Sequence, residues 1–101
     1  MDPSTLKQIM LEELAKYTGE GLNDDAYLTS NEVENIYTIV DIATIRDRRI
    51  ISTVLVTRIV NQSIIIEVDR HDKPLVEALT ARGVPENQIV LAYRGEALPA
   101  L

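Results

Sequence analysis

The sequence predicts a single α+β domain over residues 1–101, with an N-terminal helix, a four-stranded antiparallel meander, a short second helix and a C-terminal strand. Three observations lead to this prediction. Apolar residues recur every three or four positions near the N-terminus, and at every second position between residues 26 and 69. Residues 72–93 then combine signals for a helix start, a helix stop and a strand. A length of 101 residues also suits one domain better than two.

The first element is an amphipathic helix, expected over residues 3–18. Its apolar stripe consists of Leu6, Ile9, Met10, Leu14 and Tyr17. The acidic residues Glu12 and Glu13 fall largely outside that stripe. Either Asp2 or Ser4 can cap the N-terminus, and Gly19 is expected to end the helix. The segment after it, residues 19–25, is expected to be a loop.

Four strands with short polar connections follow. They are expected over residues 26–31, 36–45, 50–60 and 64–68, with turns at 31–35, 46–49 and 60–63. Strands joined so closely form an antiparallel meander. Apolar side chains occur on both faces of these strands, so each face needs cover. Helices from the two chain ends can cover one face, and self-association or a protein partner is expected at the other.

The second helix begins after a polar segment. Asp72 can cap it, with Pro74 in its first turn, where the missing N–H does no harm. The apolar side of this helix consists of Leu75, Val76 and Leu79.

The end of the second helix has its own signature. Gly83 supplies a left-handed residue, Val84 can pack back on the preceding turn, and Pro85 prevents the helix from continuing, as in a Schellman motif. A strand is expected over residues 88–93, and residues 95–101 are expected to form a tail.

Composition and charge restrict the function. The sequence has no cysteine, so it has no disulfide, no thiolate nucleophile and no thiolate metal site. No apolar run is long enough to span a membrane, and the N-terminus does not read as a signal peptide, so a cytoplasmic location is expected. The net charge of −6 gives no general attraction to nucleic acid. Protein surfaces are the more favoured partners.

Two charged residues interrupt apolar strand patterns. Asp41 lies within "IVDIA" and Arg58 within "VLVTRIV". Because a buried carboxylate is costly without a partner, we expect the two to pair across the sheet. A structural salt bridge is the favoured interpretation, and a polar spot that orients a protein partner is the alternative.

The remaining candidate residues are polar. Arg46, Arg48 and Arg49 form the one basic cluster, at a hairpin turn, where they can contact a phosphate or an acidic protein surface, or simply be solvated. The only histidine, His71, has Asp69 and Asp72 beside it, and a solvated turn is the favoured reading there. We predict no catalytic, cofactor-binding or metal-binding residues.

The order of residues resembles the XisI family of element excision controlling factors, found mainly in cyanobacteria. The resemblance is carried by "DKPLVEALTARGVPENQIVLAY", by the central "IYTIVDIATIRDRRIISTVLVTRIVNQSIIIEVD" with its basic pair Arg48 and Arg49, and by "ELAKY". It implies a compact α+β domain with a twisted antiparallel sheet. It also implies an accessory role in programmed excision of a DNA element during heterocyst differentiation, beside a recombinase and the endonuclease-like protein XisH. The resemblance provides no catalytic residue.

Three hypotheses for function follow. The leading one is a non-enzymatic protein that binds and controls a XisH-like nuclease through an apolar sheet face or a free strand edge. The second is direct DNA binding by Arg46, Arg48, Arg49 and Arg58. The third and least favoured is an enzyme acting through Asp41, Asp69, His71 or Asp72. A homo-oligomer is expected under all three.

Overall fold

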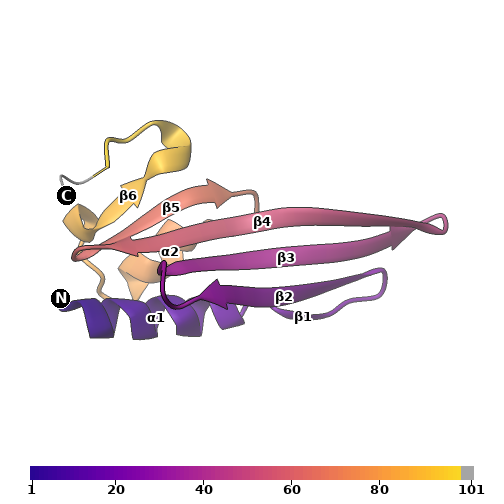
Figure 1. Ribbon diagram of the computed structural model, residues 1–101, viewed down its shortest axis with the longest axis horizontal. Helices are drawn as coiled ribbons and strands as arrows, with labels where there is room; N and C mark the ends of the chain where they lie inside the picture. Colours follow the sequence, from indigo (N-terminus) through magenta and orange to yellow (C-terminus); the bar gives the residue numbers. More distant parts are fainter. Residues whose placement is uncertain (99–101) are drawn as a thin grey trace.

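In the computed structural model, which describes residues 1–98, a six-stranded sheet packs against two helices on one of its faces (Figure 1). The helices are α1 (Pro3–Ala15) and α2 (Leu75–Ala81). The strands are β1 (Gly19–Glu20), β2 (Asp24–Asn31), β3 (Ile36–Ile45), β4 (Arg48–Val60), β5 (Ser63–Asp69) and β6 (Ile89–Leu91). Two 3-10 helices, η1 (Glu86–Gln88) and η2 (Ala92–Arg94), flank β6. The predicted α+β class and the order of the main elements are confirmed.

The strands follow one another across the sheet in chain order. Strands β1 to β5 are antiparallel neighbours, whereas β6 runs parallel to β5 because α2 carries the chain back along the sheet. The predicted four-stranded meander is therefore incomplete. Residues 19–25, expected to be a loop, contain β1, in which Gly19 pairs with Ala26. A strand of two residues is too short to produce a periodic pattern in the sequence.

The start of α1 is as predicted, but its end is not. The Asp2 carboxylate accepts a hydrogen bond from the Thr5 N–H at 2.9 Å, so Asp2 is the cap. The helix ends at Ala15, three residues before the predicted boundary. Gly19, expected to stop the helix, instead begins β1.

The start of α2 differs from the prediction. Pro74 precedes the helix, and the N–H of Leu75 donates to the Asp69 carboxylate at 2.8 Å. Asp69 therefore does the capping that was assigned to Asp72. A side chain six residues upstream can reach the helix because the intervening segment turns sharply. The Asp69 carboxylate also accepts from the His71 N–H at 3.1 Å.

The end of α2 confirms the prediction of a Schellman motif. Gly83 has a φ of +90°, and its N–H donates to the carbonyl of Thr80 at 3.0 Å. The N–H of Val84 donates to the carbonyl of Leu79 at 3.1 Å. Both Val84 and Leu79 are buried in the core, which is the apolar contact that accompanies this motif. After Pro85, the predicted strand 88–93 is shorter than expected and is limited to β6.

The core lies between the sheet and the two helices. The apolar stripe predicted for the N-terminal helix is confirmed, because Leu6, Met10 and Leu14 are fully buried. The sheet contributes alternate residues to the same core. These are Tyr37, Ile39, Leu55, Ile64 and Ile66. No helix among residues 1–98 is long and apolar enough to cross a membrane.

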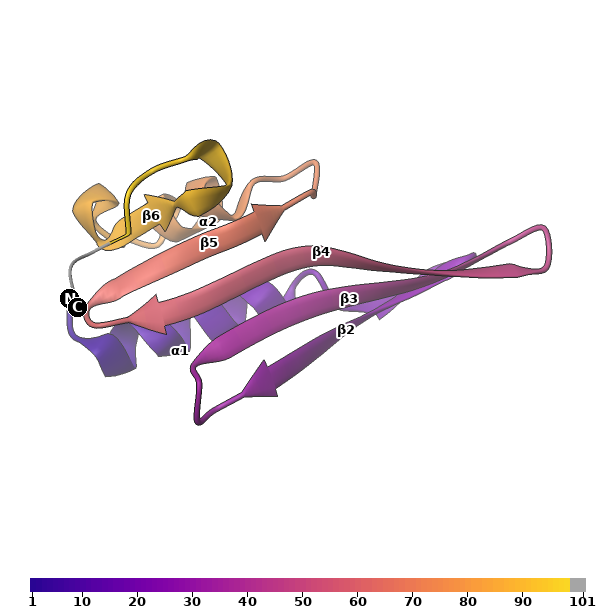
Figure 2. The same cartoon turned by 45° about the horizontal axis from the view of Figure 1, so that its top comes forward.

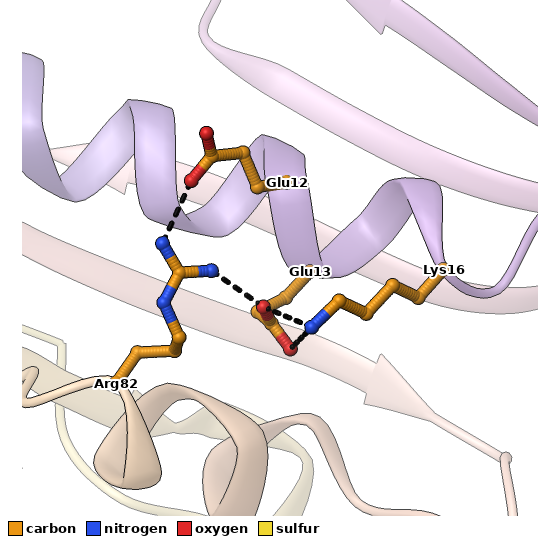
Figure 3. Close-up of polar contacts among 4 residues, drawn as sticks. All are labelled: Glu12, Glu13, Lys16 and Arg82. Atoms are coloured by element: carbon orange, nitrogen blue, oxygen red, sulfur yellow. Dashed lines mark hydrogen bonds and ion pairs between the residues drawn. The ribbon is translucent and has the colours of Figure 1, made fainter.

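An ionic cluster joins the two helices at the edge of this core (Figure 3). Glu13, predicted to lie largely outside the apolar stripe, is only 4% exposed. Its carboxylate accepts from Lys16 Nζ at 2.8 Å and from Arg82 Nη1 at 2.7 Å, and Arg82 also binds Glu12. The hydrogen bond from Lys16, and then the one from Arg82, lower the pKa of Glu13 despite its burial. Glu13 is therefore a charged residue of the interface between α1 and α2.

The opposite face of the sheet is covered only at one end. The C-terminal segment after β6 folds over β5 (Figure 1). Ile65, which points to this face, is fully buried. Of the predicted tail at residues 95–101, Glu96 is tied to β6, because its carboxylate accepts from the Leu91 N–H at 2.7 Å. Residues 99–101 lie outside the described residues.

Candidate interaction surface

The sheet face that points away from α1 and α2 is uncovered over β2, β3 and β4 (Figure 2). Strand register places Tyr27 opposite Val40, and Ile42 opposite Ile51, on this face. We call these four residues, together with Val56, the open face. Tyr27 is 50% exposed and Ile51 is 69% exposed, while the others are half-buried. These apolar side chains share the face with Thr29, Thr38 and Thr53, and no element among residues 1–98 covers it.

Beyond β5, strands β3 and β4 continue as a two-stranded hairpin. Strand β5 ends at Asp69, opposite Leu55, so residues 48–53 of β4 pair with β3 on one side and have no strand on the other side in the described chain. We call residues 42–53 the arm. It projects along the longest dimension of the molecule, which measures 45 Å (Figure 1). A register shift between Ile39 and Val40 marks a β-bulge just before the arm, and bulges increase local strand twist.

The end of the arm is a tight turn with charged residues around it. Arg46 and Asp47 form a two-residue turn with φ values of +50° and +66°, as a type I′ hairpin requires. The predicted turn at 46–49 is thus too long, because Arg48 and Arg49 already belong to β4. All three arginines are exposed, and none forms an ion pair within residues 1–98. The exposed side chains of Ile45, Ile50 and Ile51 lie beside them.

The predicted pairing of Asp41 with Arg58 is wrong. Asp41 lies opposite Ser52, while Arg58 lies further along β4, opposite Ile36. The two also point to opposite faces of the sheet. Asp41 is two residues after the core residue Ile39 and so shares its face, whereas Arg58 directly follows the buried Thr57 and points to the other face. Arg58 binds Glu67 of β5 instead, at 2.8 Å.

Asp41 faces a hollow of about 240 Å³ on the helix side of the sheet, between β2 and the segment after β5. Its Oδ1 atom is buried and has no hydrogen-bond donor among the described residues. Burial, followed by the adjacent carboxyl of Asp24, raises the pKa of Asp41. Asp41 therefore takes up a proton more readily than a solvated aspartate does.

Of the other three residues considered for catalysis, His71 and Asp69 have structural contacts. His71 Nδ1 accepts from the Lys73 N–H at 3.1 Å, and the His71 ring packs edge-on against Tyr17, with centroids 4.6 Å apart. Asp69 caps α2. Asp72 is exposed in the same turn. Burial raises the pKa of Tyr17 to about 12, and its hydroxyl donates to the Lys73 carbonyl at 2.7 Å. These contacts build the turn that leads into α2.

The sequence predicted the arginine cluster, but it did not predict which residues form the open face. The members of the open face come from three strands, and only the register brings them together. The available signal was the presence of apolar residues on both faces of the predicted strands. The exposed isoleucines of the arm were also missed, because a long apolar strand pattern does not reveal where a neighbouring strand ends.

The sequence matches a protein-family model, and the fold matches solved structures. The family model described as XisI protein matches residues 3–99. A crystal structure of a XisI-like protein from Anabaena variabilis has a TM-score of 0.70 and 20% identity, covering 87% of this chain and 83% of that chain. The fdxN element excision controlling factor XisI from Anabaena variabilis has a TM-score of 0.62 and 20% identity, covering 89% of this chain and 81% of that chain. No curated protein matches the sequence.

Proposed function

The chain belongs to the XisI family, and from this membership we propose that it is a non-enzymatic accessory factor that binds and controls a DNA-processing enzyme in programmed DNA excision. One of the structures with a similar fold is described as an excision controlling factor. The proposed partner is a XisH-like nuclease, as the family resemblance implies, and the proposed location is the cytoplasm. The open face is the proposed contact surface.

The observation that carries this proposal is the uncovered apolar surface over β2, β3 and β4. Removing apolar side chains of a strand face from water is favourable by roughly 25 cal/mol per Å² of buried apolar area. Tyr27 lies midway along β2, opposite Val40 of the middle strand, and is half exposed. Tyrosine is enriched at the centres of protein interfaces because it combines apolar area with a polar tip.

Charge also supports a protein partner. The net charge is −6, while the exposed arginines of the arm contribute positive charge at one end only. An acidic body is complementary to the basic surface that a nuclease presents to DNA, and such complementarity speeds association. In this proposal the open face provides the affinity for the partner, and the acidic charge of the molecule orients the two proteins as they associate.

The test is co-expression with a XisH-like protein, followed by size-exclusion chromatography with light scattering. We expect a stable mixed complex. The double variant Tyr27→Ser, Ile42→Thr removes apolar area from the open face and keeps strand-compatible residues, so it is expected to weaken the complex at least tenfold. Val33→Ser is the matched control, because Val33 is 88% exposed but lies in the turn between β2 and β3. Wild-type affinity in the double variant, or no complex at all, would contradict the proposal.

A second candidate function, direct DNA binding, is favoured by the position of the arginines. Arg46, Arg48 and Arg49 surround the end of a projecting two-stranded ribbon, and a ribbon of this kind fits the major groove. Arg58 drops out of this set because it binds Glu67 away from the arm.

Fluorescence anisotropy with a labelled duplex tests the second candidate. Affinity should fall steeply between 50 and 200 mM salt, as phosphate contacts require. The triple variant Arg46→Asn, Arg48→Gln, Arg49→Gln keeps a residue that tolerates positive φ in the turn and should abolish binding. Salt-independent binding, or unchanged binding by the triple variant, would rule out the arm as a DNA contact.

A further inference from the structure

We propose that two copies of this chain associate through the helix side of the arm, which is the side of the arm that faces the layer of α1 and α2. The two arms lie antiparallel, about a two-fold axis that crosses the strands at the Ala43–Ile50 pair. The occupant of this surface is a second copy of the chain. Two sheet faces pack against each other, so the strand edges and the open face stay free. The inference does not depend on the proposed function.

The helix side of the arm is the part of the core face that no helix reaches. Helix α1 ends at Ala15, well short of the end of the arm (Figure 1). The side of β3 that carries Ile39 in the core continues outward to Ala43 and Ile45. In β4, Ile50 lies opposite Ala43 on the same side. Ile45 is 52% exposed and Ile50 is 45% exposed, so an apolar strip of the sheet is left in water where α1 stops.

The outer end of this strip is basic. Arg48 lies opposite Ile45, so it points to the helix side, whereas its neighbour Arg49 points to the open face. The Arg48 side chain is exposed and forms no ion pair within residues 1–98. The guanidinium is therefore available to a carboxylate of another molecule.

The inner end of the strip is acidic. It opens into the hollow of about 240 Å³ that Asp41 faces. The hollow is lined by the carboxylates of Asp24, Asp41 and Asp72, and also by one guanidinium, that of Arg70, and by the imidazole of His71. The carboxylates outnumber the guanidinium, so the hollow favours a further cation.

A strip with a basic end, an apolar centre and an acidic end is complementary to a copy of itself turned by 180°. A two-fold axis at the Ala43–Ile50 pair places Ile50 against Ile50 of the second copy. Arg48 is two residues outward from the axis, so it comes over Ser52 of the second copy, which is two residues inward and beside the acidic hollow. The symmetry makes this contact twice, and the interface closes as a dimer.

The layer that α1 leaves empty has room for the second arm. A strand rises about 3.3 Å per residue, so the turn at Arg46 and Asp47 reaches about 11 Å beyond the axis. The nearest core residue of β3, Ile39, lies four residues inward from Ala43, at about 13 Å. The second arm therefore ends at the hollow, before the part of the sheet that the helices cover. Residues 69–72 keep their place beside β4, because the contact uses no strand edge.

Sedimentation equilibrium over a concentration series tests the dimer. The mass should rise to twice the 11.3 kDa chain mass. A contact between two-stranded arms is small, so a dissociation constant in the micromolar range is expected. Ile50→Ser and Arg48→Glu should each weaken the dimer at least tenfold, while the circular dichroism spectrum is retained. Ile51→Ser and Arg49→Glu are the matched controls and should leave the dimer unchanged, because they make the same changes at neighbouring residues that point to the open face.

Crosslinking tests the position of the axis, because the chain has no cysteine of its own. Packed sheets lie about 10 Å apart, so the two copies of residue 50 are within reach of a short bis-maleimide reagent but too far apart for a disulfide. Ile50→Cys should give a covalent dimer in high yield. Ile51→Cys is the control, because residue 51 is more exposed, at 69% in the wild type, but points away from the interface in both copies.

Three results would overturn the proposal. They are a wild-type monomer at every concentration up to about 0.5 mM, equal effects of the two substitutions within either matched pair, and equal crosslinking at residues 50 and 51. A monomer that still binds its nuclease partner would refute the dimer and leave the proposed function standing. A dimer of the expected kind that ignores the nuclease would refute the proposed function alone.

Discussion

The ionic cluster between α1 and α2 gives the sharpest prediction of stability. Replacing Arg82 by methionine keeps most of the apolar stem and removes the guanidinium, so the effect reports the loss of charge. Glu13, with a side chain only 6% exposed, then retains Lys16 as its sole cation. A hydrogen bond to a charged group contributes about 1.5–3 kcal/mol. The 38% exposure of Arg82 places the value near the lower end.

The ion pair between Arg82 and Glu12 adds little, because the Glu12 side chain is 49% exposed and exposed pairs contribute about 0–1 kcal/mol. We therefore expect Arg82→Met to lower the free energy of unfolding by about 2 kcal/mol at pH 7. For a domain of this size, that corresponds to a fall in Tm of about 8–16 °C.

Urea denaturation followed by circular dichroism measures this difference. Arg48→Met is the matched control, because Arg48 is exposed on the arm and forms no ion pair within residues 1–98, and its effect should stay within about 0.5 kcal/mol. A loss below about 0.5 kcal/mol for Arg82→Met would refute the reasoning, since Glu13 would then need no second cation.

The dependence on pH has a defined sign. The pKa of Glu13 is lower in the folded state, so its ion pairs stabilise the protein above the pKa of an unfolded glutamate. That contribution is lost as the pH falls through the folded-state pKa. The difference between wild type and Arg82→Met should therefore shrink from about pH 5 downwards.

Three further substitutions test other parts of the fold by thermal melting. Asp41→Asn should stabilise by about 1 kcal/mol at pH 7, because the carboxylate Oδ1 is buried without a donor. Since the pKa of Asp41 is raised, the wild-type protein loses stability as the pH rises through that pKa. The stabilisation by Asp41→Asn should therefore vanish in acid. A stabilisation that is independent of pH would show that the charge of Asp41 is not its cause. Gly83→Ala should lower the free energy of unfolding by about 1 kcal/mol because φ is +90°, although no atom lies within 4 Å of the added Cβ. An unchanged Tm would mean that the backbone at the end of the helix relaxes. Tyr37→Phe should cost about 1 kcal/mol, because the buried ring loses the hydrogen bond that its hydroxyl donates to Glu32 at 3.1 Å, and a neutral result would mean that water replaces that bond.

Local signals in the sequence predicted the elements that depend on neighbouring residues. The stop formed by Gly83, Val84 and Pro85 is encoded within a few positions and was predicted correctly, and the cap at Asp2 was one of the two candidates that the sequence offered. The turn between β4 and β5 was predicted for the same reason. These features need only the chemistry of adjacent residues.

Features that depend on distant residues were missed. Glu13 looks like a surface residue until Arg82, 69 positions away, is placed beside it. Asp41 and Arg58 looked like partners because both interrupt apolar patterns, but the pattern alone does not specify the face or the register of each strand. The sequence likewise indicated the open face only through apolar residues on both sides of the predicted strands. The strand pairs show which of these residues lie together on that face.

Strand β4 passes without interruption from the core of the molecule into the arm. Leu55 and Thr57 are fully buried between β3 and β5, while Ile51 has a strand on one side only. Amide hydrogens of a single strand should therefore exchange with solvent at very different rates, slowly at Leu55 through global unfolding and rapidly at Ile51 through local opening. The arm can fray while the core stays folded. A binding partner that orders it would then appear in exchange experiments as protection confined to the outer half of one strand.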